Sequence, residues 1–331
     1  MATIWGDTEG MLESRAKGQT LTGLNGDNNY IYGDAFLIED RRGGNDVLTG
    51  GASSTNNLLF GDAHEMSGNQ GGNDVLIGGS NSALNLLYGD AFQMFDSHGG
   101  NDVLTGGANF GYYLNKLYGD AFLMFDSKGG NDVLTGGSST ALNFLYGDAV
   151  QMSGSEGGND VMTGDANSSV NELYGDALRV SDSQCGNDTL IASINLSFGV
   201  FKAKSMLYGD AQSHLDGNVH CGNDRLISGT GNDDMWGDIG YSGITNSPLD
   251  LTCVTTGQDV FIFSANNGTD TIHDFRHGED KIELNGIGVA SFDELMSHLQ
   301  SGETNTVITF ESNTITVIGV TEMTAADFLF T

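Results

Sequence analysis

Aspartates recur in pairs along most of this 331-residue chain, each inside one of two glycine-containing phrases that alternate. The phrase L-Y-G-D-A, or a close variant, supplies Asp34, Asp62, Asp90, Asp120, Asp148, Asp176 and Asp210. The phrase G-G-N-D-V-L-T-G-G, or a close variant, supplies Asp46, Asp74, Asp102, Asp132, Asp160, Asp188 and Asp224. Carboxylates and backbone carbonyls are the ligands that hard divalent cations prefer. The pattern therefore predicts a series of cation sites.

The spacing within each unit is nearly constant. Twelve residues separate the two aspartates in six of the seven units, and fourteen separate Asp210 from Asp224 in the last. Full units, measured between successive L-Y-G-D aspartates, are 28, 28, 30, 28, 28 and 34 residues long. A constant loop with variation elsewhere indicates a geometric constraint on that loop, as in a solenoid of stacked coils.

Short apolar segments predict three strands in each coil. V-L-T and L-L-Y are two of them, and the third lies between the paired aspartates, where apolar residues stand two apart, as in Phe36 and Ile38. Such alternation is typical of a strand with one buried face. We expect an all-β fold: a right-handed parallel β-roll or β-helix with inserted flaps that carry the third strand. Its inner ladders would be Leu48, Leu76, Leu104 and Leu134, and Leu59, Leu87, Leu117 and Leu145.

An antiparallel sandwich of short strands is the alternative fold. Such a sandwich would not require near-identical loops at a fixed period, so the repeat favours the solenoid.

Stacked coils would bring equivalent aspartates into columns. Strands lie about 4.8 Å apart, and at an effective dielectric near 20 neighbouring carboxylates would repel by about 3 kcal/mol. Ca²⁺ between the coils would remove this repulsion, because it accepts about six to eight oxygen ligands. Mg²⁺ suits carbonyl-rich loops less well, and Zn²⁺ would favour His and Cys, which do not recur through the repeat.

The predicted ligands also include atoms outside the paired aspartates. Carbonyls would come from glycines in the G-N-D turns, and Asp233 and Asp238 would extend the series; the glycines are Gly44, Gly72, Gly100, Gly130 and Gly158. The alternative is that G-D and G-N-D serve only as turn formers.

Residues 44 to 51, G-N-D-V-L-T-G-G, resemble the calcium-binding nonapeptide G-G-x-G-x-D-x-U-x of the RTX (repeats-in-toxin) family. Residues 57 to 62, N-L-L-F-G-D, resemble the same pattern on the opposite side of the coil. The resemblance implies a hemolysin-type calcium-binding repeat. On the opposite side the aspartate position holds Asn57, Asn85, Asn115, Asn143 and Asn171, and stacked amides can form a ladder without metal. We expect calcium mainly on the aspartate side, with Asp233 as a further ligand.

From Gln258 onward the repeat gives way to D-V-F-I-F, H-D-F-R-H-G-E-D-K-I-E-L and A-A-D-F-L-F. This segment resembles the terminal cap and secretion region that follows RTX repeats in serralysin-type proteases. The resemblance implies recognition by type I secretion machinery and export to the extracellular space. Asp259, Asp270, Asp274 and Asp280 could form a final calcium site or lie in surface turns.

The predicted organisation has four parts. Residues 1–30 form an N-terminal cap, 31–238 a solenoid of about seven 28-residue coils, 239–257 a linker, and 258–331 the C-terminal cap and secretion region.

The composition limits the kinds of partner that we expect this chain to bind. The formal net charge is -32, from 44 acidic and 12 basic residues, which disfavours nucleic acid and anionic membrane surfaces. No apolar run approaches the roughly 18 residues that span a membrane. The N-terminus, M-A-T-I-W-G-D-T-E-G, shows no signal peptide, which agrees with type I secretion. Calcium ions are the expected partners, together with extracellular polysaccharide or a cell surface.

Cysteines stand at two equivalent positions. Cys185 and Cys221 each precede G-N-D in adjacent coils, so a disulfide between them and two small residues in glycine slots are both open. Cys253 has no matching partner and is expected to be unpaired.

Catalytic motifs are not found in the sequence. H-E-M-S-G at His64 lacks the second histidine of H-E-x-x-H, and no G-x-S-x-G elbow occurs. His64, His98, His214 and His220 are expected to be exposed polar residues near the flaps. The aromatic residues Tyr112, Tyr113, Phe95 and Phe125 could form an apolar binding strip or pack in ladders.

The sequence thus predicts a secreted calcium-binding solenoid that folds on binding calcium and has a structural, surface or matrix-interaction role. The alternative is a calcium-dependent lyase, epimerase or isomerase with its site on the flap face, and no catalytic residue is assigned.

Overall fold

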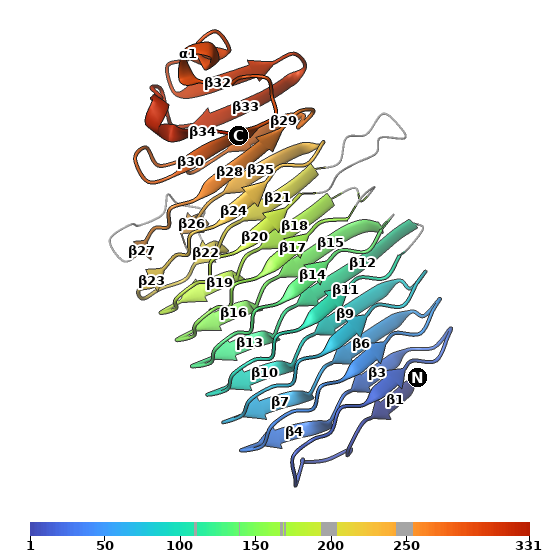
Figure 1. The fold of residues 1–331 in the computed structure, drawn as a ribbon. Helices are drawn as coiled ribbons and strands as arrows, with labels where there is room; N and C mark the ends of the chain where they lie inside the picture. Colours follow the sequence, from blue (N-terminus) through green and yellow to red (C-terminus); the bar gives the residue numbers. More distant parts are fainter. Residues whose placement is uncertain (109–110, 139, 166–167, 169, 193–203, 243–253) are drawn as a thin grey trace.

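The computed structural model describes the chain except residues 109–110, 139, 166–167, 169, 193–203 and 243–253. The described residues wind into a β-solenoid whose coils stack along one axis, with the C-terminal segment at one end (Figure 1). Three long sheets run along the stack, and nearly every pairing within them is parallel. The predicted all-β parallel solenoid is therefore confirmed.

The first sheet contains the L-L-Y segments. Its order is β1 (Ala2–Trp5), β3 (Asn29–Tyr32), β6 (Asn56–Phe60), β9 (Leu84–Tyr88), β12 (Gly111–Tyr118), β15 (Thr140–Tyr146), β18 (Val170–Tyr174), β21 (Lys204–Tyr208), β25 (Asn232–Trp236), β29 (Thr269–Ile272), β33 (Asn313–Ile318), β32 (Asn305–Phe310) and β31 (Leu299–Ser301).

The second sheet contains the segments between the paired aspartates. It comprises β4 (Ala35–Glu39), β7 (Ala63–Ser67), β10 (Ala91–Phe95), β13 (Ala121–Phe125), β16 (Ala149–Ser153), β19 (Ala177–Ser181), β22 (Ala211–His214) and β26 (Ile239–Ser242).

The third sheet contains the V-L-T segments. It comprises β2 (Thr20–Thr22), β5 (Val47–Thr49), β8 (Val75–Ile77), β11 (Val103–Thr105), β14 (Val133–Thr135), β17 (Val161–Thr163), β20 (Thr189–Ile191), β24 (Arg225–Ile227), β28 (Val260–Ser264), β30 (Lys281–Asn285) and β34 (Phe328–Phe330).

Equivalent repeat residues pair across adjacent coils, which places like side chains in ladders. Leu59 pairs with Leu87 in the first sheet, and Leu48 pairs with Leu76 in the third. These leucines belong to one apolar core and are fully buried. Both predicted inner ladders are therefore confirmed, and they exist because parallel pairing in constant register repeats the same inward residue in each coil.

The second sheet does not bury the residues that the sequence pattern predicts for the flap strand. Ala91 and Met94 are fully buried, whereas Phe92 is only partly buried, and Phe36 is 44% exposed. The expected common buried face of Phe36 and Ile38 is therefore wrong. Alanine and the residue three positions later face a second apolar core, and the strands form a continuous eight-stranded sheet along the stack.

An aromatic column runs along the solenoid from Trp5 to His273. Neighbouring rings have centroids 4.0 to 5.1 Å apart and planes within 12° of parallel. The tyrosines of the L-Y-G-D phrase form most of it. Shorter stacks flank it, including Phe92 with Phe122 at 5.0 Å. Ring stacking between coils adds to the apolar burial that holds one coil to the next.

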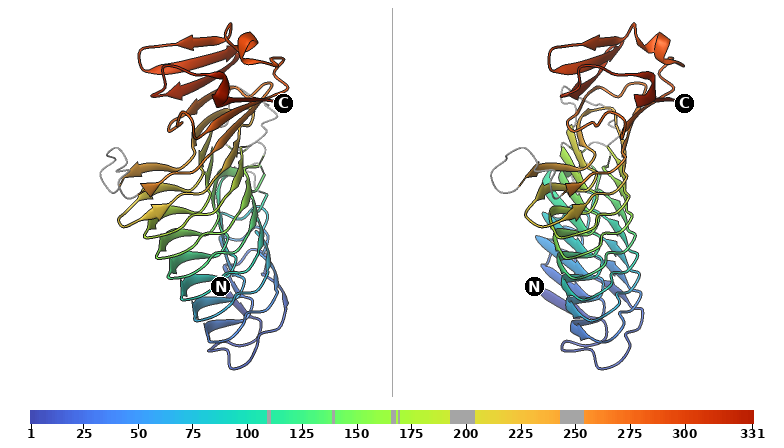
Figure 2. Two further views of the ribbon diagram at one scale, coloured as in Figure 1. Left: turned by 60° about the vertical axis from the view of Figure 1, so that its left-hand side comes forward. Right: turned by 90° about the vertical axis from the view of Figure 1, so that its left-hand side faces the viewer.

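The ends of the stack continue its sheets. β1 and β2 extend the first and third sheets into residues 1–30, and β26 extends the second sheet past residue 238. Two short strands, β23 (Val219–His220) and β27 (Val254–Thr255), pair beside the second sheet. At the C-terminal end the antiparallel strands β31 to β33 and the short helices α1 (Phe292–Leu295) and η2 (Ala325–Asp327) close the stack (Figure 2).

Candidate metal sites

Two turns in each coil carry the predicted ligands. Asp34 lies between β3 and β4, and Asp46 directly precedes β5. The equivalent aspartates in later coils occupy the same turns and are at most 1% exposed. We call the series that begins at Asp34 the Y-G-D column and the series that begins at Asp46 the N-D column. The structure thus places the paired aspartates of the repeat inside the solenoid.

Backbone amides hold the N-D column in place. The N–H of Asp46 donates to Asp74 Oδ1 at 2.6 Å, and the N–H of Asp74 donates to Asp102 Oδ1 at 2.6 Å. The series continues to Asp259 and Asp280, where the distances are 2.9 and 3.0 Å. Each carboxylate therefore uses one oxygen to join its coil to the preceding one, and its second oxygen remains for another partner.

The Y-G-D column is held from within its own coil. Asp34 Oδ2 accepts from the N–H of Gly44 at 2.8 Å, and Asp62 Oδ2 accepts from Gly72 at 2.8 Å. Asp90 accepts from Gly100 through both oxygens, at 3.0 and 3.1 Å. This bond joins residues ten apart in the six turns that have the twelve-residue spacing and residues twelve apart in the Asp210 turn, so the donating glycine always lies two residues before the second aspartate.

Most of these carboxylates keep one buried oxygen without a hydrogen-bond partner among the described residues. The aspartates concerned are Asp34, Asp46, Asp62, Asp74, Asp102, Asp132, Asp148, Asp160, Asp176, Asp188, Asp210, Asp224 and Asp259. A buried polar oxygen without a partner costs about 1 to 3 kcal/mol. Because such an oxygen recurs in coil after coil, the columns fit a partner other than a hydrogen-bond donor of the protein.

Burial and mutual repulsion oppose ionisation of the columns. Burial raises the pKa of Asp34 to about 6 and that of Asp46 to about 8. The pKa values of Asp62 and Asp102 lie well above their ordinary range, because burial and neighbouring aspartates such as Asp90 both disfavour the charged form. Among the described residues, Arg276 is the one cationic side chain that pairs with a predicted ligand, and that ligand is Asp238.

Glycines line both columns because side chains would not fit there. A Cβ on Gly89 would collide with the carbonyl oxygen of Gly119 and with Asp102 Oδ2. A Cβ on Gly72 would collide with the carbonyl oxygen of Gly44. The carbonyls of the predicted ligand glycines, Gly44, Gly72, Gly100 and Gly130, therefore each lie against the glycine of the next coil, and that of Gly158 lies against Gly186.

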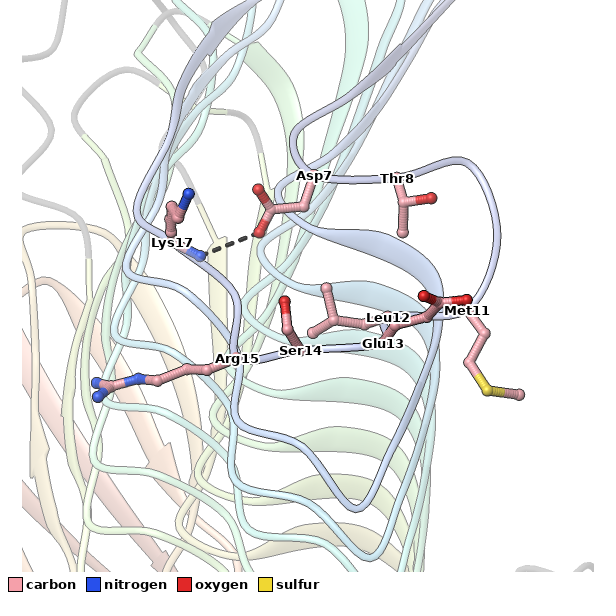
Figure 3. Close-up of a pocket in the computed structure, with 8 residues that line it drawn as sticks. All are labelled: Asp7, Thr8, Met11, Leu12, Glu13, Ser14, Arg15 and Lys17. Atoms are coloured by element: carbon pink, nitrogen blue, oxygen red, sulfur yellow. Dashed lines mark hydrogen bonds between the residues drawn. The ribbon is translucent and has the colours of Figure 1, made fainter.

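The N-terminal end of the columns is open to solvent. Asp7 takes the place of a Y-G-D aspartate in the first coil, where its Oδ2 accepts from the N–H of Lys17 at 3.0 Å and its Oδ1 accepts from the amide of Gln19 at 3.0 Å. A surface pocket surrounds it (Figure 3), lined by Asp7, Thr8, Met11, Leu12, Glu13, Ser14, Arg15 and Lys17.

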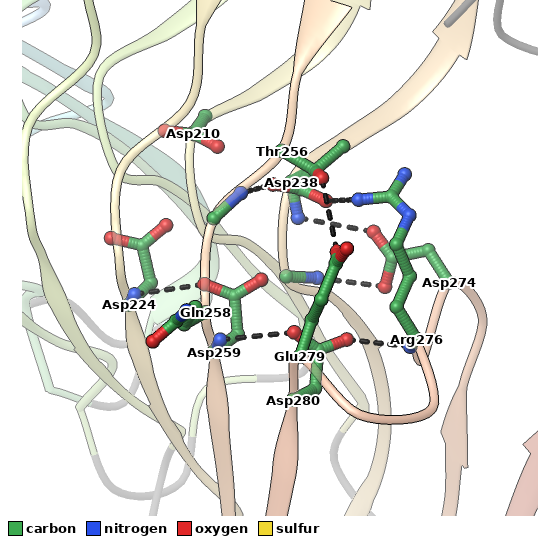
Figure 4. A network of polar contacts seen from close by, with 12 residues as sticks. Asp210, Asp224, Asp238, Thr256, Gln258, Asp259, Asp274, Arg276, Glu279 and Asp280 are labelled. Atoms are coloured by element: carbon green, nitrogen blue, oxygen red, sulfur yellow. Dashed lines mark hydrogen bonds and ion pairs between the residues drawn. The ribbon is translucent and has the colours of Figure 1, made fainter.

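At the C-terminal end of the columns, an arginine side chain lies among the aspartates (Figure 4). Arg276 pairs with Asp238, and Asp274 accepts from the N–H groups of Gly237 and Asp238 at 2.8 and 3.0 Å. Asp259 and Asp280 are 1% exposed and continue the N-D column. The interpretation of these two residues as surface-turn residues is therefore wrong.

The opposite side of the coil carries the predicted amide ladder. Nδ2 of each asparagine donates to Oδ1 of the next, at 2.9 Å from Asn57 to Asn85 and 3.0 Å from Asn115 to Asn143. Asn29 adds an earlier rung at 2.8 Å. The expected amide ladder is therefore confirmed.

Aspartates replace the amides at the C-terminal end of this side. The N–H of Asp233 donates to Asp270 Oδ1 at 2.9 Å, and Asp233 Oδ2 accepts from Gly229. Asp270 is fully buried, so a surface turn is wrong for it as well. Burial and the charge of Asp233 raise the pKa of Asp270 to about 7.

The histidines follow the prediction in part. His98 and His220 are exposed. His64 is instead sandwiched between Phe36 and Phe92, with ring centroids 4.8 and 5.2 Å away, and His214 is 6% exposed with Nε2 3.0 Å from the carbonyl oxygen of Gly217. The expectation of exposed side chains is wrong for these two, because the second sheet packs them against neighbouring coils.

The predictions for the aromatic residues and the cysteines can be compared with the structure at four positions. Phe95 stacks on Phe125 at 5.4 Å, which fits a ladder. The side chains of Tyr112 and Tyr113, and the whole of Cys253, lie outside the described residues. Cys185 and Cys221 are free thiols.

The fold and the carboxylate columns together define a class of protein, the RTX-type parallel β-solenoid with acidic turns. The model of the family described as Peptidase M10 serralysin C terminal matches residues 44–330, so the chain belongs to the serralysin C-terminal family. The described residues contain no helix long and apolar enough to cross a membrane.

Comparison with individual proteins adds little to the family match. Among curated proteins, none matches this chain. A solved structure with some similarity is the extracellular lipase LipA from Serratia marcescens, at 14% identity and a TM-score of 0.25. The similarity covers 86% of this chain and 40% of the lipase.

The donor set fits calcium. Carboxylate oxygens of Asp34, Asp46 and Asp62 lie within 4.8 Å of one another. Two oxygens bound to one Ca²⁺ at 2.3 to 2.6 Å can be up to about 5 Å apart, so one ion could contact all three carboxylates. The buried oxygens without partners are of the kind that such an ion accepts, and the ion would supply the positive charge that these columns lack.

Proposed function

We propose that this protein is a secreted calcium-binding β-solenoid that completes its fold when it binds calcium outside the cell. Its role would be structural, at a surface or in an extracellular matrix. The ligands would be the aspartates of the Y-G-D and N-D columns, with carbonyl oxygens of the turn glycines, and Asp233 and Asp238 at the end of the array. Membership of the serralysin C-terminal family supports both calcium binding and type I export.

The observation that carries the proposal is the pair of buried carboxylate columns. Each column repeats an acidic oxygen that has no hydrogen-bond partner among the described residues. Within the same part of the chain, Arg276 is the one cationic side chain that pairs with a proposed ligand, Asp238. Without added cations, folding would force these charges together or require their protonation. A calcium ion at each level would remove that cost, so its binding free energy would become folding free energy.

This coupling also fits export. At the low calcium concentration of a cytoplasm the columns would keep the chain expanded, and at millimolar calcium outside they would close. At a calcium concentration of 100 times Kd, each independent site would add about 2.7 kcal/mol to the stability of the folded chain.

Chelation tests the proposal. The purified chain is monitored by far-ultraviolet circular dichroism and size-exclusion chromatography, first in millimolar calcium, then with excess EDTA, and then after calcium is restored. Magnesium at the same concentration is the matched control. We expect loss of the β signal and expansion in EDTA, recovery with calcium and little recovery with magnesium. An unchanged spectrum and melting temperature in EDTA would contradict the proposal.

A further inference from the structure

Two coils break the glycine pattern of the Y-G-D column. The first glycine of the G-G-N-D phrase occurs as Gly43, Gly71, Gly99, Gly129 and Gly157, and then as Cys185 and Cys221. This position matters because it faces carboxylates from two coils. At Gly157 a Cβ would collide with Asp176 Oδ1 and lie 2.7 Å from Asp148 Oδ2. At Gly129 it would collide with Asp148 and lie 2.8 Å from Asp120 Oδ2.

The cysteines therefore bring sulfur into the carboxylate column. Ligand atoms of Asp176, Cys185 and Asp210 lie within 4.8 Å of one another, as do those of Asp210, Cys221 and Asp238. Asp210 belongs to both groups. The two thiols thus lie on either side of one shared carboxylate.

Two of the carboxylates beside the cysteines each have an oxygen without a hydrogen-bond partner among the described residues. Asp176 and Asp210 are fully buried, and their Oδ1 atoms accept from the N–H groups of Gly186 and Gly222 at 2.8 and 2.7 Å. Oδ2 of each has no hydrogen-bond partner among the described residues. Asp238 is different because its Oδ2 pairs with Arg276. The unpartnered acceptors therefore lie on Asp176 and Asp210, next to the sulfurs.

We propose that Cys185, Cys221, Asp210 and Asp176 form a site for a thiophilic divalent cation such as Zn²⁺, distinct from the calcium sites of the other coils. Two sulfurs and two carboxylate oxygens form a four-ligand set of the type that Zn²⁺ binds tetrahedrally. Sulfurs bound to one Zn²⁺ at about 2.3 Å lie about 3.8 Å apart, which is less than the spacing of about 4.8 Å between stacked coils, so the two cysteine side chains would have to turn toward each other around Asp210 to complete the site. Binding converts both thiols to thiolates and releases their protons to solvent.

Calcium suits this place less well than the other coils. A thiolate is a soft ligand, whereas Ca²⁺ takes oxygen ligands. The two cysteine side chains also occupy space that glycine leaves free elsewhere in the column. The chain would therefore carry two kinds of metal site along one column, selected by the residue that precedes G-N-D.

Cadmium provides a direct probe, because its binding to thiolate produces an ultraviolet charge-transfer absorption that binding to carboxylate does not. The full chain is kept in millimolar calcium with a non-chelating phosphine reductant and titrated with Cd²⁺, and Zn²⁺ is then added in competition. We expect the band to saturate at one Cd²⁺ per chain and to be displaced by Zn²⁺ but not by further calcium.

The chain offers matched variants. Cys185→Gly and Cys221→Gly restore the residue found in the other coils, so they should fold, and each should lose the cadmium band. Cys253→Ser should keep it. Circular dichroism in calcium verifies folding, and it separates failure of this site from failure of the calcium proposal.

Three outcomes would overturn the inference. The first is no band in the reduced, folded chain. The second is a band that survives Cys185→Gly or Cys221→Gly, or one that disappears with Cys253→Ser. The third is peptide mapping that finds a Cys185–Cys221 disulfide in protein purified without reductant and with Zn²⁺ present throughout.

Discussion

A single buried aspartate shows why the columns would need a cation. Asp102 is 1% exposed, its Oδ1 accepts from the N–H of Asp74, and its Oδ2 has no hydrogen-bond partner among the described residues. Burial and the charges of Asp90 and Asp132 hold its pKa well above the ordinary range. Such a residue opposes folding when it is charged and alone, and it supports folding when a cation lies beside it.

Replacing this carboxylate should have opposite effects with and without calcium. Asp102→Asn keeps the shape but removes the charge and one oxygen ligand. We expect the chelated protein to gain about 1 to 3 kcal/mol of stability and the calcium midpoint for folding to move to a higher concentration. Calcium titrations followed by circular dichroism measure both. Asp96→Asn, at an exposed residue, is the control and should change neither; the same response from both variants would contradict the role of Asp102.

The raised pKa values predict how the calcium-free protein responds to pH. Folded-state pKa values are about 6 for Asp34, Asp90 and Asp148 and about 8 for Asp46 and Asp210, against an ordinary 3.8. Between these values the folded chain holds more protons than the unfolded chain. Stability in EDTA should therefore be greatest below about pH 4 and fall as pH rises toward 8. Circular dichroism of the EDTA-treated chain across this range tests it: the β signal should be present at the acidic end and be lost as the pH rises, and the opposite trend would contradict the prediction.

Calcium should reverse this dependence, because it binds the ionised carboxylates. Its affinity should rise between about pH 6 and pH 8, with protons released on binding. The release can be measured by calorimetry in buffers of different ionisation enthalpy.

At the scale of the strand and turn, glycine controls how closely the coils approach. Gly89→Ala would place a methyl group against Asp102 Oδ2 and the carbonyl of Gly119. We expect a loss of about 3 kcal/mol or more in the calcium-loaded protein, because two backbone levels would have to separate. Gly10→Ala, where nothing lies within 4 Å of the added carbon, is the control. Denaturant unfolding in calcium compares them, and equal stability would show that the turns are not tightly packed.

The amide ladder should not tolerate a charge. Asn115 Nδ2 donates to Asn143 and to the carbonyl of Gly107, and Asn115→Asp would replace that donor by an acceptor. We expect a loss of about 3 kcal/mol from the buried charge and the unsatisfied neighbours. Asn101→Asp is the control, because exposed Asn101 uses its oxygen to accept from Asn131 and an aspartate keeps that oxygen. Thermal unfolding in calcium should separate the two, and an equal shift would contradict the ladder's contribution.

The repeat explains which elements the sequence could predict. Leu48 and Leu59 recur at fixed positions, so parallel stacking in constant register brings each onto its copy, and the amide ladder follows by the same reasoning. The face of the second sheet could not be read from alternation. Alanine and methionine three residues apart are buried there, whereas Phe92 leaves the core to stack on Phe122.

The candidate site shows the same division. The aspartates of both turns were predictable from their spacing, since an acidic residue at every level of a stack requires neutralisation. Asp7 and the pairing of Arg276 with Asp238 required the three-dimensional structure, because the end coils depart from the repeat. The aromatic column could have been expected from the recurring tyrosine of L-Y-G-D, which the same parallel register stacks.

At the scale of the whole molecule, the columns and ladders form one continuous stack. The aromatic column runs from Trp5 to His273, and the N-D column runs from Asp46 to Asp280. Each coil contacts mainly its neighbours, so the stability of the array depends on every interface between coils. If one level lacked its cation, the carboxylates at that level would repel one another. Calcium would therefore stabilise the solenoid along its whole length.

The most direct test is a crystal structure of the calcium-loaded chain with anomalous difference density measured at a long X-ray wavelength. The account predicts a row of anomalous peaks between successive coils, each about 2.3 to 2.6 Å from carboxylate oxygens of both columns. A refined structure in calcium that has the same fold, no peaks along the columns and aspartates that hydrogen-bond directly to one another would contradict it.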